Sequence, residues 1–160
     1  MKRLLVLPAL VTLALSQAGG GAGPRRPPAP NFTFTDLGGE QVSLADLRGQ
    51  VVIVLFGALG CAPCRENDQL LRQYQLEYLT HDLAVISLHE RATLEALRRY
   101  DAEFTFSTLT GLDPGQEIAR RYHASPLPVT VFIDRDGLIR GVHRGRLDEG
   151  QLVQALGGLL

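Results

Sequence analysis

The 160-residue sequence has no tryptophan, one methionine and only two cysteines. A structural zinc site takes four ligands, so two cysteines without a second cysteine pair leave such a site incomplete. An excess of positive charge is also missing, because 16 lysines and arginines are balanced by 17 aspartates and glutamates. Without a basic stripe the chain has little to neutralise a phosphate backbone, and we expect no nucleic acid partner.

A long hydrophobic run is absent as well. The apolar stretch Leu4–Leu15 is shorter than the roughly 20 residues that a membrane-spanning helix needs. Lys2 and Arg3 precede it, and Ser16-Gln17-Ala18 places small residues where export cleavage requires them. We therefore interpret residues 1–18 as a signal peptide, with an uncleaved anchor as the alternative, and expect a periplasmic or otherwise extracytoplasmic protein.

The rest of the chain divides into a linker and one domain. Residues 19–30 are rich in glycine and proline and predict a solvated linker. Residues 31–160 form a single expected domain, in a chain that is 45% hydrophobic and 21% charged. Export changes the meaning of the two cysteines, because outside the cytosol such a pair can be a structural staple. The spacing of the two cysteines therefore has to distinguish a structural disulfide from a redox-active pair.

Strand and helix signals alternate along this domain. The run 51–56 is continuously apolar and largely β-branched, which indicates a central strand covered on both faces. A helical stretch ending near residue 78 joins it to a second buried strand, 83–88, as a right-handed βαβ unit. Residues 129–143 surround an Asp-Gly turn and predict an antiparallel hairpin. The pattern predicts an α/β fold with a central mixed sheet flanked by helices.

Turn and capping signals place the remaining elements. Each is a short segment bounded by glycine, proline or a side chain that can cap a helix. We expect an opening hairpin at 32–35 and 41–43, a helical turn at 44–48, a helix capped by Thr93 that buries Leu94 and Leu97, a helix with a capping box at Asp113 and Gln116, and a closing helix with a capping box at Asp148 and Gln151 that aligns Leu152, Val153, Leu156 and Leu159.

The two cysteines are separated by two residues and lie where the central strand passes into a helix. There, unpaired backbone N–H groups and the helix dipole favour a thiolate at Cys61, and the charge of Arg65 adds to this effect. Cys61 would then exchange disulfides with a partner, and Cys64 would resolve the mixed disulfide. Pro63 fits the first turn of the helix and restricts the ring. The spacing favours a redox-active disulfide.

Two other uses of the pair are weaker. A purely structural disulfide would gain little, because the stabilisation from closing a loop grows with the loop's length. A metal site would need further ligands, but the four histidines lack motif spacing and are expected at the surface or in loops. These histidines are His81, His89, His123 and His143.

Several motifs, taken together, resemble the TlpA-like extracytoplasmic thioredoxins, a group that includes thiol reductases serving cytochrome c maturation. The similarity covers essentially all of residues 31–160. It is carried by Phe32-Thr33-Phe34-Thr35-Asp36-Leu37, Val42-Ser43-Leu44-Ala45-Asp46-Leu47-Arg48-Gly49, the strand that starts at Val51, Cys61-Ala62-Pro63-Cys64-Arg65 and Pro128-Val129-Thr130-Val131-Phe132-Ile133-Asp134.

The resemblance implies a thioredoxin-like fold with an N-terminal β-hairpin extension, and a thiol-disulfide oxidoreductase. It implies that Cys61 is the exposed nucleophile and Cys64 the resolving thiol. It further implies that Pro128 is a cis-proline beside the disulfide, and that the backbone of Leu127 binds an extended substrate segment. No cofactor or metal is required. The implied partners are protein thiols or disulfides and a membrane thiol-electron donor, with the protein itself a monomer.

Three positions depart from the pattern of this group. Gly60 stands where the group has a tryptophan, so a flat apolar contact beside the disulfide is missing. Asn67 stands where many members have a glutamate that assists the resolving thiol, with Glu66 and Asp68 on either side. Leu55 occupies the position of the buried aspartate of cytosolic thioredoxin. Proton transfer to Cys64 therefore lacks its usual acceptor, and Glu66 is a candidate substitute.

The residues leave other functions open. The direction of electron flow depends on the reduction potential of the pair, so a reductase or an oxidase is compatible with the sequence. A copper-handling chaperone would use paired thiolates with a histidine, although such proteins usually space their cysteines by three residues. A peroxiredoxin would have threonine three residues before the reactive cysteine, and Ala58 stands there instead.

Overall fold

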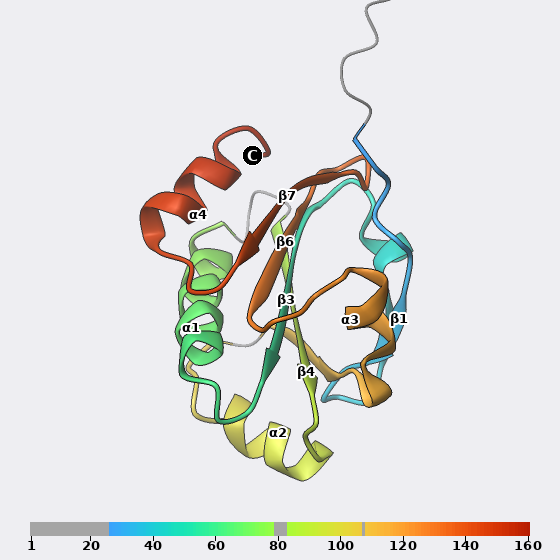
Figure 1. Ribbon diagram of the computed structural model, residues 1–160, viewed down its shortest axis with the longest axis vertical. Helices are drawn as coiled ribbons and strands as arrows, with labels where there is room; N and C mark the ends of the chain where they lie inside the picture. Colours follow the sequence, from blue (N-terminus) through green and yellow to red (C-terminus); the bar gives the residue numbers. More distant parts are fainter. Residues whose placement is uncertain (1–25, 79–82, 107) are drawn as a thin grey trace, which may run out of the picture.

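A computed structural model describes residues 26–78, 83–106 and 108–160 of the chain. Its centre is a five-stranded mixed sheet with the strand order β5-β4-β3-β6-β7, drawn in Figure 1. The β3–β4 and β4–β5 pairs are parallel, whereas β6 and β7 add antiparallel strands on the other side of β3. The strands are β3 (Val51–Ala58), β4 (Leu83–Glu90), β5 (Leu109–Leu112), β6 (Val129–Ile133) and β7 (Ile139–Arg144).

Strand β3 lies in the middle of the sheet, as its uninterrupted apolar run predicts. Seven of its eight residues are buried, and side chains from Val51 to Phe56 alternate between the two faces. Val51, Ile53 and Leu55 belong to one half of the core, and the residues between them belong to the other half. The predicted mixed sheet flanked by helices is confirmed.

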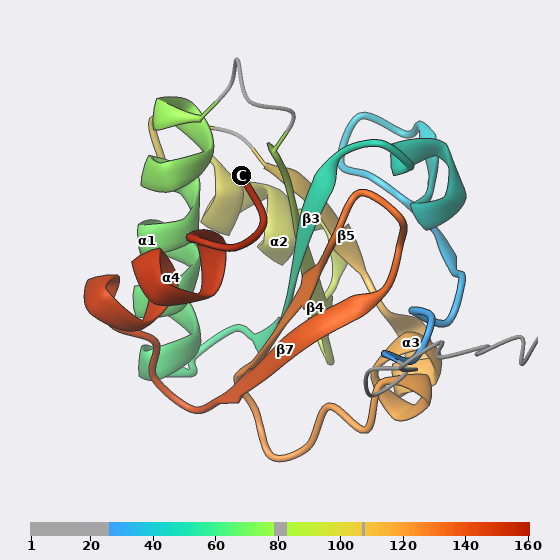
Figure 2. The same cartoon turned by 90° about the horizontal axis from the view of Figure 1, so that it is seen from above.

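One face of the sheet is covered by α1 (Ala62–Glu77) and α4 (Glu149–Leu156), as Figures 1 and 2 show. Leu71 of α1 and Leu152 of α4 are fully buried against this face. The predicted capping box at the start of α4 is present, because the Asp148 and Gln151 side chains each bind the other's backbone N–H. Val153, expected on the buried face of α4, is exposed instead.

The opposite face is covered by the small sheet of β1 (Thr33–Thr35) and β2 (Gln41–Ser43) together with α3 (Glu117–Arg121) (Figure 2). This sheet is the predicted N-terminal hairpin, and it is followed by a single 3-10 turn, Leu44–Leu47. Phe34 of β1 is buried in the core on this side. The α2 helix (Leu94–Asp101) covers the end of the sheet near β5; it buries Leu97 as predicted but leaves Leu94 exposed.

The helix predicted from Asp113 is interrupted. A 3-10 turn, Pro114–Gln116, comes first, and the backbone then breaks because Gly115 and Gln116 both have positive φ. Gln116 therefore makes no capping box. Asp113 still caps α3, because its carboxylate accepts hydrogen bonds from the backbone N–H groups of Ile118 and Ala119 beyond the break. The capping residue was predicted correctly, but the break allows it to cap from five residues away.

The folded part of the chain begins before the predicted boundary at residue 31. Ala29 is buried and donates its N–H to the carbonyl of Gly137, and the Pro27 carbonyl accepts from Ile139. The end of the expected 19–30 linker is thus a strap along the β6–β7 hairpin. The expected signal peptide, residues 1–18, lies outside the described residues. Among the residues that are described, no helix combines the length and apolar character needed to cross a membrane.

Gly111 of β5 lets the N-terminal hairpin approach the main sheet. A Cβ atom at this position would overlap the Phe34 ring and stand 2.8 Å from the carbonyl oxygen of Thr35. We predict that Gly111→Ala lowers the free energy of unfolding by about 1–3 kcal/mol, as overpacking of a core does. Urea unfolding of the oxidised protein measures the loss. Gly158→Ala, where an added Cβ meets no atom within 4 Å, is the control. Equal midpoints for both variants would contradict this close approach.

Candidate functional site

The two cysteines lie at the junction between β3 and α1. Cys61 is the N-cap of α1, and its sulfur accepts a hydrogen bond from the Cys64 backbone N–H at 3.3 Å. Pro63 lies in the first turn of the helix, where its missing N–H costs nothing. The structure joins Cys61 and Cys64 in a disulfide, with their Cα atoms 5.2 Å apart. The expected position of the pair, between a buried strand and a helix, is confirmed.

The two cysteines differ in solvent exposure. Cys61 is partly exposed, whereas Cys64 is 1% exposed. Cys64 lies against Gly57 of β3, where an added Cβ would be 3.3 Å from the Cys64 Cβ. A side chain at position 57 would therefore crowd Cys64 and force it to shift. A partner can therefore reach Cys61, while Cys64 faces the interior.

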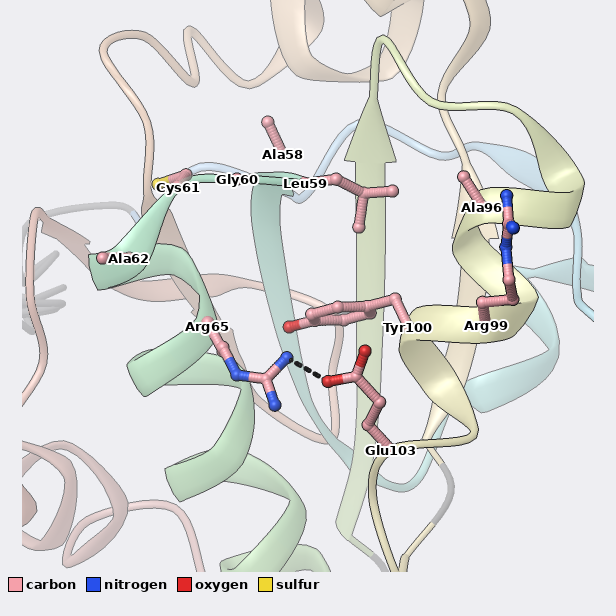
Figure 3. Close-up of a pocket in the computed structure, with 10 residues that line it drawn as sticks. All are labelled: Ala58, Leu59, Gly60, Cys61, Ala62, Arg65, Ala96, Arg99, Tyr100 and Glu103. Carbon is pink, nitrogen blue, oxygen red and sulfur yellow. Dashed lines mark ion pairs between the residues drawn. The ribbon is translucent and has the colours of Figure 1, made fainter.

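A cavity of about 450 Å³ opens beside Cys61, between the β3–α1 loop and α2. Figure 3 shows its walls: Leu59 and the Tyr100 ring on one side of the opening and the start of α1 on the other. Gly60 has a φ of 78° and no atom within 4 Å of where its Cβ would be. The site that holds tryptophan in the resembling group is open space here.

Arg65, predicted to add positive charge near Cys61, turns toward α2. Its guanidinium forms an ion pair with Glu103 at 2.8 Å, marked in Figure 3, and lies over the rings of Tyr100 and Phe104. The carboxylate of Glu103 offsets part of the charge that Arg65 brings to the site. Arg65 therefore forms one wall of the cavity.

On its other side, Cys61 borders a second cavity of about 550 Å³, which Leu127 and the loop before β6 help to line. The Ser125–Pro126 and Leu127–Pro128 peptide bonds are both cis. Arg144 of β7 holds this loop, because its guanidinium donates to the carbonyls of Ser125 and His123. Cys61 and Leu127, expected to lie in one site, thus line the same cavity.

Beneath Cys64 lies a buried polar cluster that we call the α1–α2 network: Asp68, Arg72, Tyr100, Asp101 and Thr110. Asp68 and Arg72 follow Cys64 at intervals of four residues, so all three share one face of α1. Arg72 is 2% exposed and forms ion pairs with Asp68 and Asp101. Asp68 also accepts from the Tyr100 hydroxyl at 2.9 Å. Burial, with Asp68 adding to it, raises the pKa of Tyr100 well above its ordinary value.

His89 was expected at the surface or in a loop, and this prediction is wrong. The residue lies on β4, paired with Gly57 of β3, and is 1% exposed. Its Nε2 atom is 3.1 Å from the Ser87 hydroxyl and 3.9 Å from the Asp68 carboxylate. Desolvation by burial lowers the pKa of His89, although Asp68 acts in the opposite direction. The imidazole is therefore neutral at pH 7.

The other histidines behave more as expected. His123 is exposed, His143 is partly exposed on the edge strand β7, and His81 lies outside the described residues. Within the described parts of the chain, no group of three or more His, Cys, Asp or Glu side chains is arranged to hold a metal ion.

Glu66, the candidate substitute for the missing proton acceptor, lies on the outer face of α1. It forms an ion pair with Arg146, and both side chains are largely exposed. Its neighbour Asn67 points inward instead, where its side chain donates to the Gly145 carbonyl and accepts from the Leu147 N–H. Asn67 is 0% exposed and anchors the segment before α4, whereas Glu66 stays at the surface of α1.

Sequence reasoning missed the α1–α2 network and His89. The available signal was the four-residue spacing of Cys64, Asp68 and Arg72, which places two charges on the same helix face as a buried cysteine. The contacts with Tyr100 and Asp101 depend on how α2 packs against α1, which local patterns do not encode.

We predict that Arg72→Met destabilises the protein by about 3–5 kcal/mol, because it leaves the buried carboxylate of Asp68 without its partner. The free energy of unfolding, measured with urea at pH 7, reports this loss. Arg99→Met is the matched control, since Arg99 forms an exposed ion pair with Glu95, and it should cost less than about 1 kcal/mol. Similar losses for both variants would show that the network contributes no more than a surface pair.

Comparison with known proteins places this site in a family. The sequence pattern of the AhpC/TSA family matches residues 26–142. The thiol-disulfide oxidoreductase ResA of Bacillus thuringiensis is 29% identical over 128 residues, which cover 80% of this chain and 74% of that protein.

Two solved structures extend the likeness to the fold. One, from Bacteroides thetaiotaomicron and provisionally named a protein disulfide isomerase, is 31% identical with a TM-score of 0.76, covering 84% of this chain and 88% of its own. The other, from Chlorobium tepidum and provisionally named the thiol:disulfide interchange protein DsbE, is 27% identical with a TM-score of 0.74, covering 84% and 99%. The chain therefore belongs to the AhpC/TSA family and is a thiol-disulfide oxidoreductase of thioredoxin-like fold, similar to ResA and DsbE, with Cys61 and Cys64 as its cysteine pair.

Proposed function

We propose that this protein is an extracytoplasmic reductase of protein disulfides. The observation that carries the proposal is the asymmetry of the pair: Cys61 is partly exposed at the N-terminus of α1, and Cys64 is 1% exposed behind it. One sulfur can be reached by a large partner, while the other can be reached only from within the protein. This arrangement suits an exchange in which the partner is attacked first and then released.

In the reduced protein, the Cys61 thiolate attacks one sulfur of the substrate disulfide. A bond forms between Cys61 and that sulfur, and the other substrate sulfur leaves with the electron pair of the broken bond. Cys64 then attacks the sulfur of Cys61, which forms the internal disulfide and frees the second substrate thiol. The N–H of Cys64, which donates to the Cys61 sulfur, favours the attacking thiolate.

The two cavities beside Cys61 would hold the substrate segment. In this proposal the backbone of Leu127, next to the cis-proline Pro128, pairs with an extended stretch of the substrate. Arg65 and Pro63 act in support, since Arg65 forms part of one cavity and Pro63 restrains the first turn of α1. The protein would work as a monomer, without a cofactor, and would be recharged by a membrane thiol-electron donor.

One further observation supports the reductase direction: the positive charge near Cys61 is largely offset, so the Cys61 thiolate gains little from it. A strong oxidant owes its potential to a stabilised reduced form. Four arginines line the cavities next to Cys61. Three of them are paired with carboxylates: Arg65 with Glu103, Arg91 with Glu90 and Arg99 with Glu95. The fourth, Arg120, donates to the carbonyl of Gly115. A weakly stabilised thiolate gives up its electrons readily, which supports a reductase. The similarity to the TlpA-like group, with its reductases of cytochrome c maturation, points the same way.

We predict a reduction potential for the Cys61/Cys64 couple close to that of thioredoxin, about −270 mV. Equilibration with glutathione buffers, followed by thiol alkylation, measures it. A value near that of a strong oxidant, about −120 mV, would contradict the reductase proposal and favour an oxidase.

We also predict that Cys64→Ser accumulates mixed disulfides at Cys61, because the second attack is lost. The readout is mass spectrometry of the variant after incubation with oxidised insulin. Cys61→Ser is the matched control and should accumulate none, since Cys64 is buried. Trapping by Cys61→Ser alone would reverse the assigned roles. If neither variant traps insulin and the reduced wild type retains one equivalent of Cu(I), the copper chaperone replaces the reductase.

A further inference from the structure

The α1 face of the sheet changes character along the strands. At one end it presents apolar residues, including Ile53 and Val85, and at the end near the disulfide it presents Ser87, His89 and Thr110. A histidine in this position is costly to bury unless its polar atoms are used. The two-step exchange proposed above does not use His89.

His89 and Cys64 border the same small space. A Cβ placed on Gly57 would stand 3.8 Å from the Cys64 sulfur and 3.9 Å from Cε1 of His89. Because position 57 is glycine, no side chain fills the space between the thiol and the imidazole. The ring is held edge-on to Tyr100, with 5.2 Å between centroids. The imidazole is thus fixed in orientation next to the buried cysteine.

The surroundings of His89 determine which nitrogen can accept a proton. Its Nε2 atom faces two oxygen acceptors, the Ser87 hydroxyl and the Asp68 carboxylate, which favours the tautomer with hydrogen on Nε2. The other nitrogen, Nδ1, is buried and has no hydrogen-bond partner among the described residues. Its lone pair is therefore available as a base.

We propose that the His89 imidazole is the proton acceptor for the Cys64 thiol when Cys64 resolves the mixed disulfide. This inference rests on the proposed function and completes its second step. As the Cys64–Cys61 bond forms and the Cys61–substrate bond breaks, the substrate sulfur leaves as a thiolate with the electron pair. The Cys64 proton moves to Nδ1 of His89 and is later released to water. Asp68 stabilises the transient imidazolium.

The charged and titratable groups around His89 fit this role. Asp68 and Arg72 face it from α1, and Tyr100 and Asp101 face it from α2. Among them, Asp68 is the rival base on the helix face below Cys64. Its carboxylate, however, forms an ion pair with Arg72 and accepts a hydrogen bond from the Tyr100 hydroxyl. A second rival, Glu90, lines the cavity next to Cys61 on the other side of the sheet and is paired with Arg91.

Ellman's reagent separates the two steps of the exchange in one stopped-flow trace. The reduced protein releases one thionitrobenzoate when Cys61 attacks the reagent, and a second when Cys64 resolves the Cys61 mixed disulfide. Absence of the first release would count against the proposed function itself. The second release alone tests His89, so the two failures are distinguishable.

For the wild type, we expect the second rate to be level between about pH 7 and 8 and to fall below pH 6.5. The fall follows protonation of His89, whose pKa is lowered by burial. In His89→Gln, the second rate should be about 100-fold slower at pH 7, at the lower end of what a general base contributes. It should then rise about tenfold per pH unit and approach the wild type near pH 9, where the thiol ionises unaided.

His143→Gln, a change at a partly exposed histidine whose ring contacts the Arg146 carbonyl, is the control and should match the wild type. Glu90→Gln tests the rival base. A deficit in His89→Gln that is equal at every pH, or that affects both releases equally, would overturn the proposal, as would the pH-dependent deficit occurring in Glu90→Gln instead. If His89→Gln does not fold, the wild-type profile still decides: a second rate that climbs tenfold per unit through pH 7–8 excludes a histidine base.

Discussion

The close contact between Gly57 of β3 and Cys64 of α1 is the constraint on which the rest of the structure depends. It allows the first turn of α1 to rest directly on the end of the central strand, so that one cysteine is buried and the other remains accessible. Because β3 is held between β4 and β6, this contact is made on the central strand of the sheet. The position of the disulfide therefore depends on how the strands of the sheet are paired.

The α1–α2 network fixes the position of a second element, α2, beneath the disulfide. A buried set of charges adds little net stability, since desolvation offsets most of the attraction between them. Its geometry is specific, however: Arg72 reaches Asp68 on its own helix, Asp101 on α2 and the Phe106 carbonyl beyond it. The network therefore sets how α2 lies against α1, and with it the shape of the cavity next to Cys61.

Much of this architecture could be predicted from local patterns. The apolar run of β3, the Asp-Gly turn between β6 and β7 and the capping box of α4 each depend on residues close together in sequence. The burial of His89 could not be predicted in this way. The residues around it show the same alternation along the strand whether that face of the sheet meets solvent or helix α2. The break at Gly115 and Gln116 was hidden for a similar reason: a capping signal shows where a helix can begin but not where the backbone must turn.

The strap formed by Pro27 and Ala29 lies far from the disulfide. It joins the domain at the β6–β7 turn, whereas Cys61 follows the opposite end of β3, and Figure 1 shows these two regions at opposite ends of the long axis. The chain therefore enters the described domain at the pole that lies farthest from the disulfide, and a partner that reaches Cys61 approaches from the opposite end of the central strand.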